Sequence, residues 1–265
     1  MPFFEVQNLT MVFGGLTALD NISLTLERGS INAVIGPNGA GKTTLFNCIT
    51  GLYKPTAGRI IFKGTDITGR KPYKIAAMGL GRTFQNIELF SHMTTMDNLL
   101  LGRHLHMKTG VFGGAACFGR RSPAVQEEIA QRRKVEEIID FLDLQSARDR
   151  FVGGLPYGTQ KKVELGRALA TEPELLLLDE PVAGMNLEEK QDLVIWLKDI
   201  QEVFGVTLLV IEHDMRVVMD ISQQVLVINF GKPIARGKPQ EVQNHPEVLK
   251  AYLGEDSVDQ MTGAA

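Results

Sequence analysis

The sequence predicts an α/β fold with a largely parallel sheet, and three neighbouring stretches carry that prediction. Leu175–Leu178 and Val206–Ile211 are short continuous apolar runs, typical of parallel strands that are buried on both faces. Between them, Leu187–Phe204 places apolar residues at helical spacing. Together the three stretches predict a strand, helix, strand crossover, the repeating unit of a parallel α/β sheet.

The remaining elements of the core follow from residue alternation and from chain-breaking residues. Strands are predicted over Phe3–Phe13, Ile22–Leu26 and Arg59–Phe62, because apolar residues alternate or run together there between glycine-containing breaks. Short helices are predicted over Leu45–Thr50 and Tyr73–Met78.

A helical lobe is predicted to interrupt this core between Asn86 and about Arg150. Met96–Leu105 and Val125–Leu144 are amphipathic helical patterns, and no strand pattern accompanies them. Between them, the glycine-rich stretch Lys108–Pro123 is expected to be a mobile surface loop, with contact to a membrane partner or lipid headgroups as the alternative.

Composition narrows the function classes. The chain has 265 residues, a net charge of −3 and two distant cysteines, Cys48 and Cys117, outside any metal-ligand spacing. The near-neutral charge argues against general nucleic-acid binding. Neither a signal-peptide pattern nor a run of about 18 apolar residues is present, so we expect a soluble chain whose membrane role would depend on partners.

Residues 36 to 44 form the pattern of a phosphate-binding loop between a predicted strand and a predicted helix. Glycines allow successive backbone N–H groups to surround a phosphate, and the helix N-terminus favours the same anion. Lys42 is expected to reach the β- and γ-phosphates of a nucleotide, and the hydroxyl of Thr43 suits Mg²⁺. The residues assigned to nucleotide binding here are Gly36, Pro37, Asn38, Gly39, Ala40, Gly41, Lys42, Thr43 and Thr44.

Polar residues follow three further predicted strands. Asp179 and Glu180 come directly after a buried strand, where Asp179 is expected to hold Mg²⁺ and Glu180 to act as the general base on an attacking water. His213 follows the next strand and is placed to hydrogen-bond a γ-phosphate. Gln85 follows the strand that leads into the helical lobe, where it is a candidate to sense metal or γ-phosphate.

These elements, in this order, resemble the nucleotide-binding subunit of ATP-binding cassette (ABC) transporters over essentially residues 3 to 254. The resemblance implies an ABC ATPase of the P-loop NTPase fold, with an N-terminal antiparallel β subdomain and an inserted helical lobe. It implies a core of residues 1–86 and 158–254, a lobe of residues 87–157 and a flexible tail of residues 255–265. ATP and Mg²⁺ are then the expected cofactors.

The resemblance also implies roles for residues that carry little signal alone. Phe13 would stack on adenine, and Gln85 would be a catalytic residue that also contacts Mg²⁺. Ala183–Asn186 would link two protomers of a dimer. Leu155 and Gly158 would belong to the signature stretch Leu155–Gln160, which contacts the ATP of the partner protomer.

The signature stretch departs from the family's usual Leu-Ser-Gly-Gly-Gln at Pro156. Proline provides neither a hydroxyl nor a backbone N–H for the γ-phosphate. Gly158 and the start of the next helix remain, so the phosphate contact should be weakened rather than lost. We therefore expect unequal ATP sites in a dimer with a second, different ATPase subunit, while a homodimer remains the alternative.

Within the family, several stretches look like the larger ATPase subunit of branched-chain amino-acid importers. These are Gly81–Asn86, Leu89–Phe90, Met96–Leu99, Ile211–Met215 and Ala251–Glu255. The resemblance implies two membrane permease subunits, an indirectly coupled periplasmic or extracellular solute-binding protein, no nucleic acid, and a peripheral place on the cytoplasmic face of the inner (plasma) membrane.

Other functions stay open on the sequence alone. Urea and amide importers share the same stretches, and lipopolysaccharide-export ATPases share the ending Tyr252–Glu255. A non-transport ABC ATPase of DNA maintenance or translation would usually carry a coiled-coil insertion or a second cassette, which this chain lacks. A regulatory cassette that binds but does not hydrolyse ATP is opposed by the intact Lys42, Asp179, Glu180 and His213.

Overall fold

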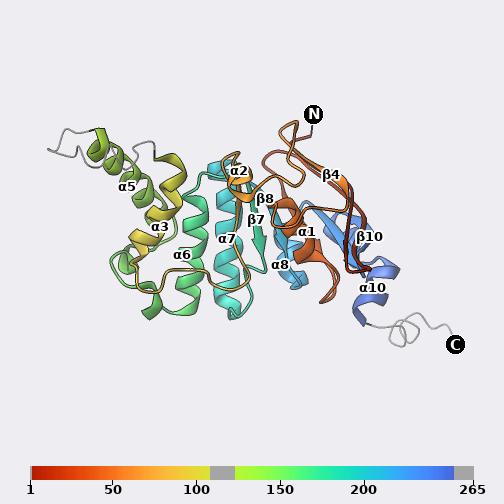
Figure 1. The fold of residues 1–265 in the computed structure, drawn as a ribbon. Helices are drawn as coiled ribbons and strands as arrows, with labels where there is room; N and C mark the ends of the chain where they lie inside the picture. Colours follow the sequence, from red (N-terminus) through yellow and green to blue (C-terminus); the bar gives the residue numbers. More distant parts are fainter. Residues whose placement is uncertain (1, 108–122, 254–265) are drawn as a thin grey trace. The chain divides into compact units, whose positions relative to one another are not determined.

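The computed structural model describes residues 2–107 and 123–253 (Figure 1). The chain forms two compact units, residues 1–82 with 174–265, and residues 83–173. Nearly all of the loop predicted over Lys108–Pro123, together with Cys117 and the predicted flexible tail, lies outside the described residues.

An antiparallel sheet of four strands opens the first unit. Its order is β2 (Leu16–Leu26), β1 (Phe4–Phe13), β4 (Ala57–Phe62) and β5 (Thr65–Asp66). Phe4 is paired with Leu26 on one side and with Phe62 on the other, and all three side chains are buried. This sheet is the predicted antiparallel β subdomain.

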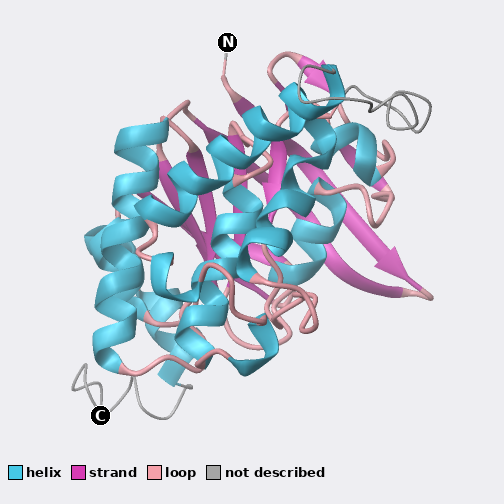
Figure 2. Ribbon diagram, turned by 90° about the vertical axis from the view of Figure 1, so that its left-hand side faces the viewer, coloured by secondary structure: helices cyan, strands magenta, loops and turns pink. Residues whose placement is uncertain are grey.

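The second sheet of this unit has six strands in the order β10-β9-β3-β8-β7-β6, coloured with the other strands in Figure 2. All neighbouring strands are parallel except β10, which is antiparallel to β9. The strands are β3 (Ile31–Ile35), β6 (Leu80–Arg82), β7 (Leu175–Asp179), β8 (Thr207–Ile211), β9 (Gln224–Asn229) and β10 (Lys232–Gly237). Every residue of β3, β7 and β8 is buried, as the continuous apolar runs predict.

The described residues of the first unit also form six helices: α1 (Lys42–Ile49), α2 (Pro72–Ala76), α7 (Leu187–Phe204), α8 (Met215–Ile221), α9 (Pro239–Gln243) and α10 (Pro246–Leu253). Helix α7 begins at a reciprocal hydrogen-bonded cap between Asn186 and Glu189, and it ends before Gly205, whose φ is 64°. Buried residues of α1, including Phe46 and Ile49, share one apolar cluster with strands of both sheets. Helix α1 is therefore fixed by the core, and so is the loop that precedes it.

The second unit is helical. Within residues 83–107 and 123–173 its helices are α3 (Thr95–Gly102), η1 (Arg103–His106), α5 (Pro123–Phe141), η2 (Gln145–Ala147), η3 (Val152–Gly154) and α6 (Tyr157–Leu169). Helices α3, α5 and α6 pack on one another at Gly166, where an added Cβ would lie 3.0 Å from Leu142 and 3.3 Å from Leu99. Residues 83–86 and 158–173, which the sequence resemblance placed in the core, lie in this second unit, where α6 packs against α3 and α5.

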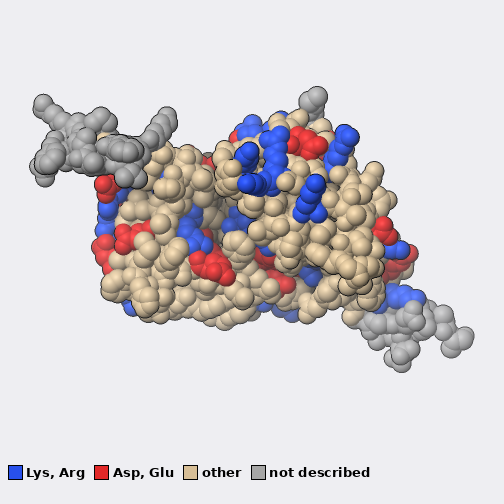
Figure 3. Space-filling view, viewed as in Figure 1, with Lys and Arg blue, Asp and Glu red and all other residues tan. Residues whose placement is uncertain are grey.

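The surface carries charges of both signs. On the face in Figure 3, lysines and arginines are interspersed with acidic residues, in keeping with the net charge of −3. Within residues 2–107 and 123–253, every helix is too short or too polar to cross a bilayer.

Candidate functional site

The predicted phosphate loop connects strand β3 to helix α1. Gly41 precedes the first helical residue with a φ of 106°, in the left-handed region that favours glycine. A Cβ on Gly41 would lie 2.6 Å from the carbonyl oxygen of Ala18, and one on Gly36 would lie 2.0 Å from that of Ile228. These close approaches and the left-handed backbone explain why the loop needs glycine at both positions.

Lys42 is the first residue of α1 and is only 6% exposed. Its Nζ donates hydrogen bonds to the carbonyl oxygens of Gly36 (2.7 Å) and Pro37 (3.0 Å), so the ammonium group lies across the start of the loop. Burial lowers the pKa of Lys42, whereas the nearby carboxylates, Glu180 first, favour its charged form. A desolvated cation beside a helix N-terminus is well suited to bind phosphate oxygens.

Asp179 ends strand β7 and is 3% exposed. Its Oδ2 accepts a hydrogen bond of 2.9 Å from Nη2 of Arg82, and Nη1 of Arg82 donates to Oδ1 of Asn47 at 2.7 Å. Burial raises the pKa of Asp179 although Arg82 opposes the shift. A buried carboxylate in this position gains from a further cation, and this favours a role as a metal ligand.

The residues present fit Mg²⁺ bound together with a nucleotide. Mg²⁺ commonly takes one or two protein oxygens, with phosphate oxygens and water completing its shell. The hydroxyl of Thr43, which is exposed at the start of α1, and the carboxylate of Asp179 have this chemistry. In the described part of the chain, no group of three or more acidic, histidine or cysteine side chains is placed to hold a metal ion.

Glu180 and His213 are close in space although 33 positions separate them in the sequence. Oε2 of Glu180 lies 3.8 Å from Nδ1 of His213, and the His213 side chain is more than half exposed. Glu180 has a φ of 48°, and its backbone N–H donates to the carbonyl of Ile211 at 2.9 Å. The structure thus brings the predicted base and the predicted γ-phosphate contact to the neighbouring ends of β7 and β8.

Sequence reasoning missed two polar residues at these strand ends. Arg82 ends β6 and is the partner of Asp179. Glu212 follows β8 directly, and its side chain is completely buried. Their position immediately at the ends of predicted parallel strands was the available signal, because such positions share one edge of the sheet.

Phe13 ends strand β1, next to the glycines of the β1–β2 turn. Its ring makes an edge contact with Tyr53, with 5.2 Å between ring centroids, and it is 40% exposed. Both rings belong to the first unit and retain exposed surface. Stacking of Phe13 on adenine stays a prediction.

Two of the predicted site segments lie in the second unit. Gln85 is exposed, and its carbonyl oxygen accepts a hydrogen bond of 2.9 Å from Nζ of Lys161. In the signature stretch, Pro156 directly precedes α6 without a side-chain cap, while Leu155 and Gly158 are buried. The roles of these residues toward ATP and Mg²⁺ stay predictions.

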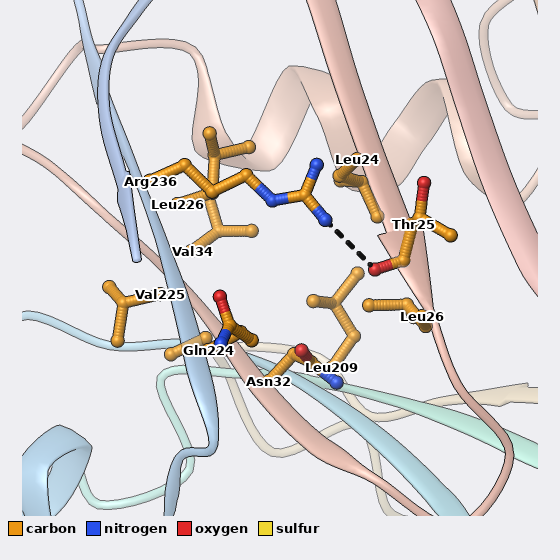
Figure 4. Close-up of a pocket in the computed structure, with 11 residues that line it drawn as sticks. Leu24, Thr25, Leu26, Asn32, Val34, Leu209, Gln224, Val225, Leu226 and Arg236 are labelled. Carbon is orange, nitrogen blue, oxygen red and sulfur yellow. Dashed lines mark hydrogen bonds between the residues drawn. The ribbon is translucent and has the colours of Figure 1, made fainter. Parts of the chain in front are cut away.

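Two hollows in the first unit differ in size. The one in Figure 4 lies among Leu24, Asn32 and Arg236, and Arg236 closes one side with a 3.3 Å hydrogen bond to the carbonyl of Thr25. It offers about 10 Å³, roughly the space of one water molecule, and is a packing gap. A surface hollow of about 520 Å³ lies beside the phosphate loop, between Asn38 and helix α10.

Comparison with known protein families agrees with the site described above. The model of the ABC transporter family matches residues 19–183. The chain belongs to the ABC transporter family. A second model, named branched-chain amino acid ATP-binding cassette transporter, matches residues 232–258.

Relatives in this family match over nearly the whole chain. The chain is 43% identical to the high-affinity branched-chain amino acid transport ATP-binding protein BraF of Pseudomonas aeruginosa and 42% identical to LivG of Escherichia coli, in each case over 96% of this chain and 98% of the relative. A crystal structure of the ADP conformation of an ABC transporter cassette matches with a TM-score of 0.83 and 33% identity, over 96% of this chain and 100% of that one. The predicted family, fold and ATPase activity are thereby confirmed, and binding of ATP follows from the family.

Proposed function

We propose that this ABC cassette hydrolyses ATP to power import of branched-chain amino acids. The observation that carries the proposal is its likeness to BraF and LivG along nearly the whole of both chains. The match of residues 232–258 to a branched-chain transporter model adds support at the C-terminal end.

The first unit supplies the groups for hydrolysis in this proposal. The phosphate loop and Lys42 hold the β- and γ-phosphates, while Thr43 and Asp179 hold Mg²⁺, which neutralises phosphate charge when bound. Glu180 accepts a proton from the attacking water, and His213 forms a hydrogen bond with the γ-phosphate. The 3.8 Å between Glu180 and His213 supports their action on one phosphate.

Gln85 and the signature stretch act in assembly. Gln85 senses Mg²⁺ or γ-phosphate, and the signature stretch contacts ATP held by a second cassette. ATP then closes a sandwich of two cassettes, and loss of the γ-phosphate reopens it, because ADP lacks the group that bridges them. Two permease subunits, a second ATPase subunit and an external solute-binding protein complete the importer at the cytoplasmic face of the membrane.

Leucine uptake tests the proposal. Cells whose sole copy of this subunit is intact should take up radiolabelled leucine, and cells that carry only Lys42→Ala should not. Excess urea or short amides should leave uptake unchanged, whereas isoleucine and valine should compete. Equal leucine uptake in both strains would reject a role in branched-chain import, and strong competition by urea or amides would redirect the solute assignment.

A further inference from the structure

Glu212 is a completely buried carboxylate for which the proposed hydrolysis has no use. It lies between Ile211, the last residue of β8, and His213. One carboxylate oxygen, Oε1, accepts a hydrogen bond of 3.1 Å from the backbone N–H of Val182. The other, Oε2, accepts from the backbone N–H groups of His213 (3.1 Å) and Asp214 (3.4 Å).

The two oxygens therefore tie together two different loops. Val182 belongs to the segment after β7, two residues beyond Glu180, whereas His213 belongs to the segment after β8. A residue with one acceptor atom, such as glutamine, can satisfy only one of these loops in the same orientation. The carboxylate is thus matched to this position by its two acceptor atoms.

The neighbouring backbone needs such support. Glu180 has a φ of 48°, a left-handed conformation that a non-glycine residue keeps only when surrounding contacts fix it. Its own backbone is held by the N–H contact to Ile211 and by the N–H of Ala183, which donates to the Glu180 carbonyl at 3.1 Å. From the end of the neighbouring strand β8, Glu212 adds a contact to Val182 in this same short turn.

Charge considerations agree with this geometry. Burial raises the pKa of Glu212, and the backbone N–H groups that it accepts from favour its ionised form. The Glu212 carboxylate also favours the charged form of Lys42, so it contributes to the field of the phosphate loop. Glu180 and Asp179 act more strongly on Lys42 than Glu212 does, so removal of Glu212 should affect chiefly the shape of the strand ends.

We propose that Glu212 is a positioning residue that holds Glu180 in register with His213, so that the hydrolysis step depends on it while ATP binding does not. This inference rests on the proposed role of Glu180 as the base. It is independent of the transported solute, because only ATP turnover is involved.

The test uses the purified full-length chain with its membrane partners. Glu212→Gln preserves size and should lower kcat about tenfold or more, with the KM for ATP and the Kd of a fluorescent ATP analogue within about twofold of the parent. Glu212→Asp retains both carboxylate oxygens on a shorter side chain, so its kcat should lie between those of the parent and of Glu212→Gln. Glu241→Gln is the matched control, because the Glu241 carboxylate also accepts a backbone N–H, from Lys238 at 2.8 Å, but at the start of α9.

A double variant separates positioning from general destabilisation. If Glu212 acts through Glu180, Glu180→Gln with Glu212→Gln should turn over within about twofold of Glu180→Gln alone, because the second change disables a group already lost. A purely structural role would instead multiply the two losses. Unchanged kcat in Glu212→Gln, or multiplicative losses in the double variant, would overturn the inference. Failed leucine uptake with these kinetics intact would overturn only the transport assignment.

Discussion

The strand ends of the first unit and the loop before α6 in the second unit are held in place in different ways. At the strand ends, Asp179 is paired with Arg82 in the interior, and the carboxylate of Glu212 is enclosed by backbone N–H groups. In the second unit, side chains of α6 donate hydrogen bonds to backbone carbonyl oxygens. Gln160 donates to the carbonyl of Leu155 at 2.8 Å, and Lys161 donates to the carbonyl of Gln85 at 2.9 Å.

The difference suggests a division of labour. Lys42 and Asp179 of the first unit are buried and hydrogen-bonded within that unit, so their geometry is set before ATP arrives. In the second unit, side chains of α6 hold the backbone of Leu155 and Gln85, and the residues Gln85 and Pro156 are exposed. Preformed geometry suits catalysis, and exposed segments suit contact with partners.

Loss of Lys42 should produce the largest effect. Lys42→Ala removes the buried ammonium from the phosphate loop, so ATP affinity should fall about 100-fold or more and turnover should become undetectable. Binding of a fluorescent ATP analogue by the purified chain measures this directly. Lys74→Ala on α2, where the lysine is exposed, is the control and should bind normally. Retained affinity in Lys42→Ala would show that the phosphate is held elsewhere.

Glu180→Gln should separate binding from chemistry. The amide cannot accept the proton, so turnover should fall about 10²- to 10⁴-fold while ATP binding persists. The assembled cassettes should then accumulate in the ATP-bound state, measured as a dimer by size-exclusion chromatography with ATP. Glu188→Gln, in the first turn of α7, supplies a control with the same change of charge. Undiminished turnover in Glu180→Gln would remove Glu180 from the base role.

The buried pair of α6 offers a stability test in the second unit. Nζ of Lys161 lies 3.3 Å from Oε2 of Glu164, and both side chains are 3% exposed. Lys161→Met leaves Glu164 buried without its cation and should cost about 3–5 kcal/mol in the free energy of unfolding. Changing both residues, Lys161→Met with Glu164→Leu, should recover most of that loss, because a packed apolar pair needs no desolvation of charge.

The same pair gives a pH dependence with a defined sign. Burial raises the pKa of Glu164 above its ordinary value, and Lys161 opposes the shift. Without Lys161 the folded pKa should rise further, so the folded state binds a proton more tightly than the unfolded state does. The loss of stability in Lys161→Met should therefore be larger at pH 8 than at pH 5, as measured by denaturant unfolding. A loss independent of pH would show that packing, rather than charge, dominates at this site.

Sequence reasoning predicted elements well where the pattern is local. The apolar runs at Leu175–Leu178 and Val206–Ile211 identified two central strands, and the helix over Leu187–Phe204 matches α7. Strands β9 and β10 were not predicted, although β9 has four consecutive buried residues, Val225–Ile228. Their neighbours in the sheet are distant in sequence or antiparallel, so no crossover pattern marked them.

The site was predictable where a motif defines it and was missed where contacts between strands define it. Lys42, Asp179 and Glu180 follow from residue type and spacing. Arg82 contacts Asp179 only because β6 lies beside β7 in the sheet. Glu212 contacts Val182 only because β8 lies on the other side of β7. Local sequence patterns also could not predict the boundary between the two units. Helix α6 belongs to the second unit because it packs on α3 and α5, and that packing is not visible in the sequence.

A change at Pro156 should produce the smallest effect, but it tests directly whether the loop before α6 contacts ATP. It precedes α6 with no side-chain cap, so Pro156→Ser should add a hydroxyl acceptor for the first helical N–H groups and stabilise the helix by about 1 kcal/mol. If the signature stretch also contacts ATP of the second cassette, the hydroxyl should raise turnover of the assembled complex a few-fold. Pro156→Ala lacks the hydroxyl but regains the backbone N–H, so it separates these two contributions. Higher thermal stability of Pro156→Ser without any change in turnover would assign Pro156 to the fold of α6 alone, and the predicted inequality of the two ATP sites would then be wrong.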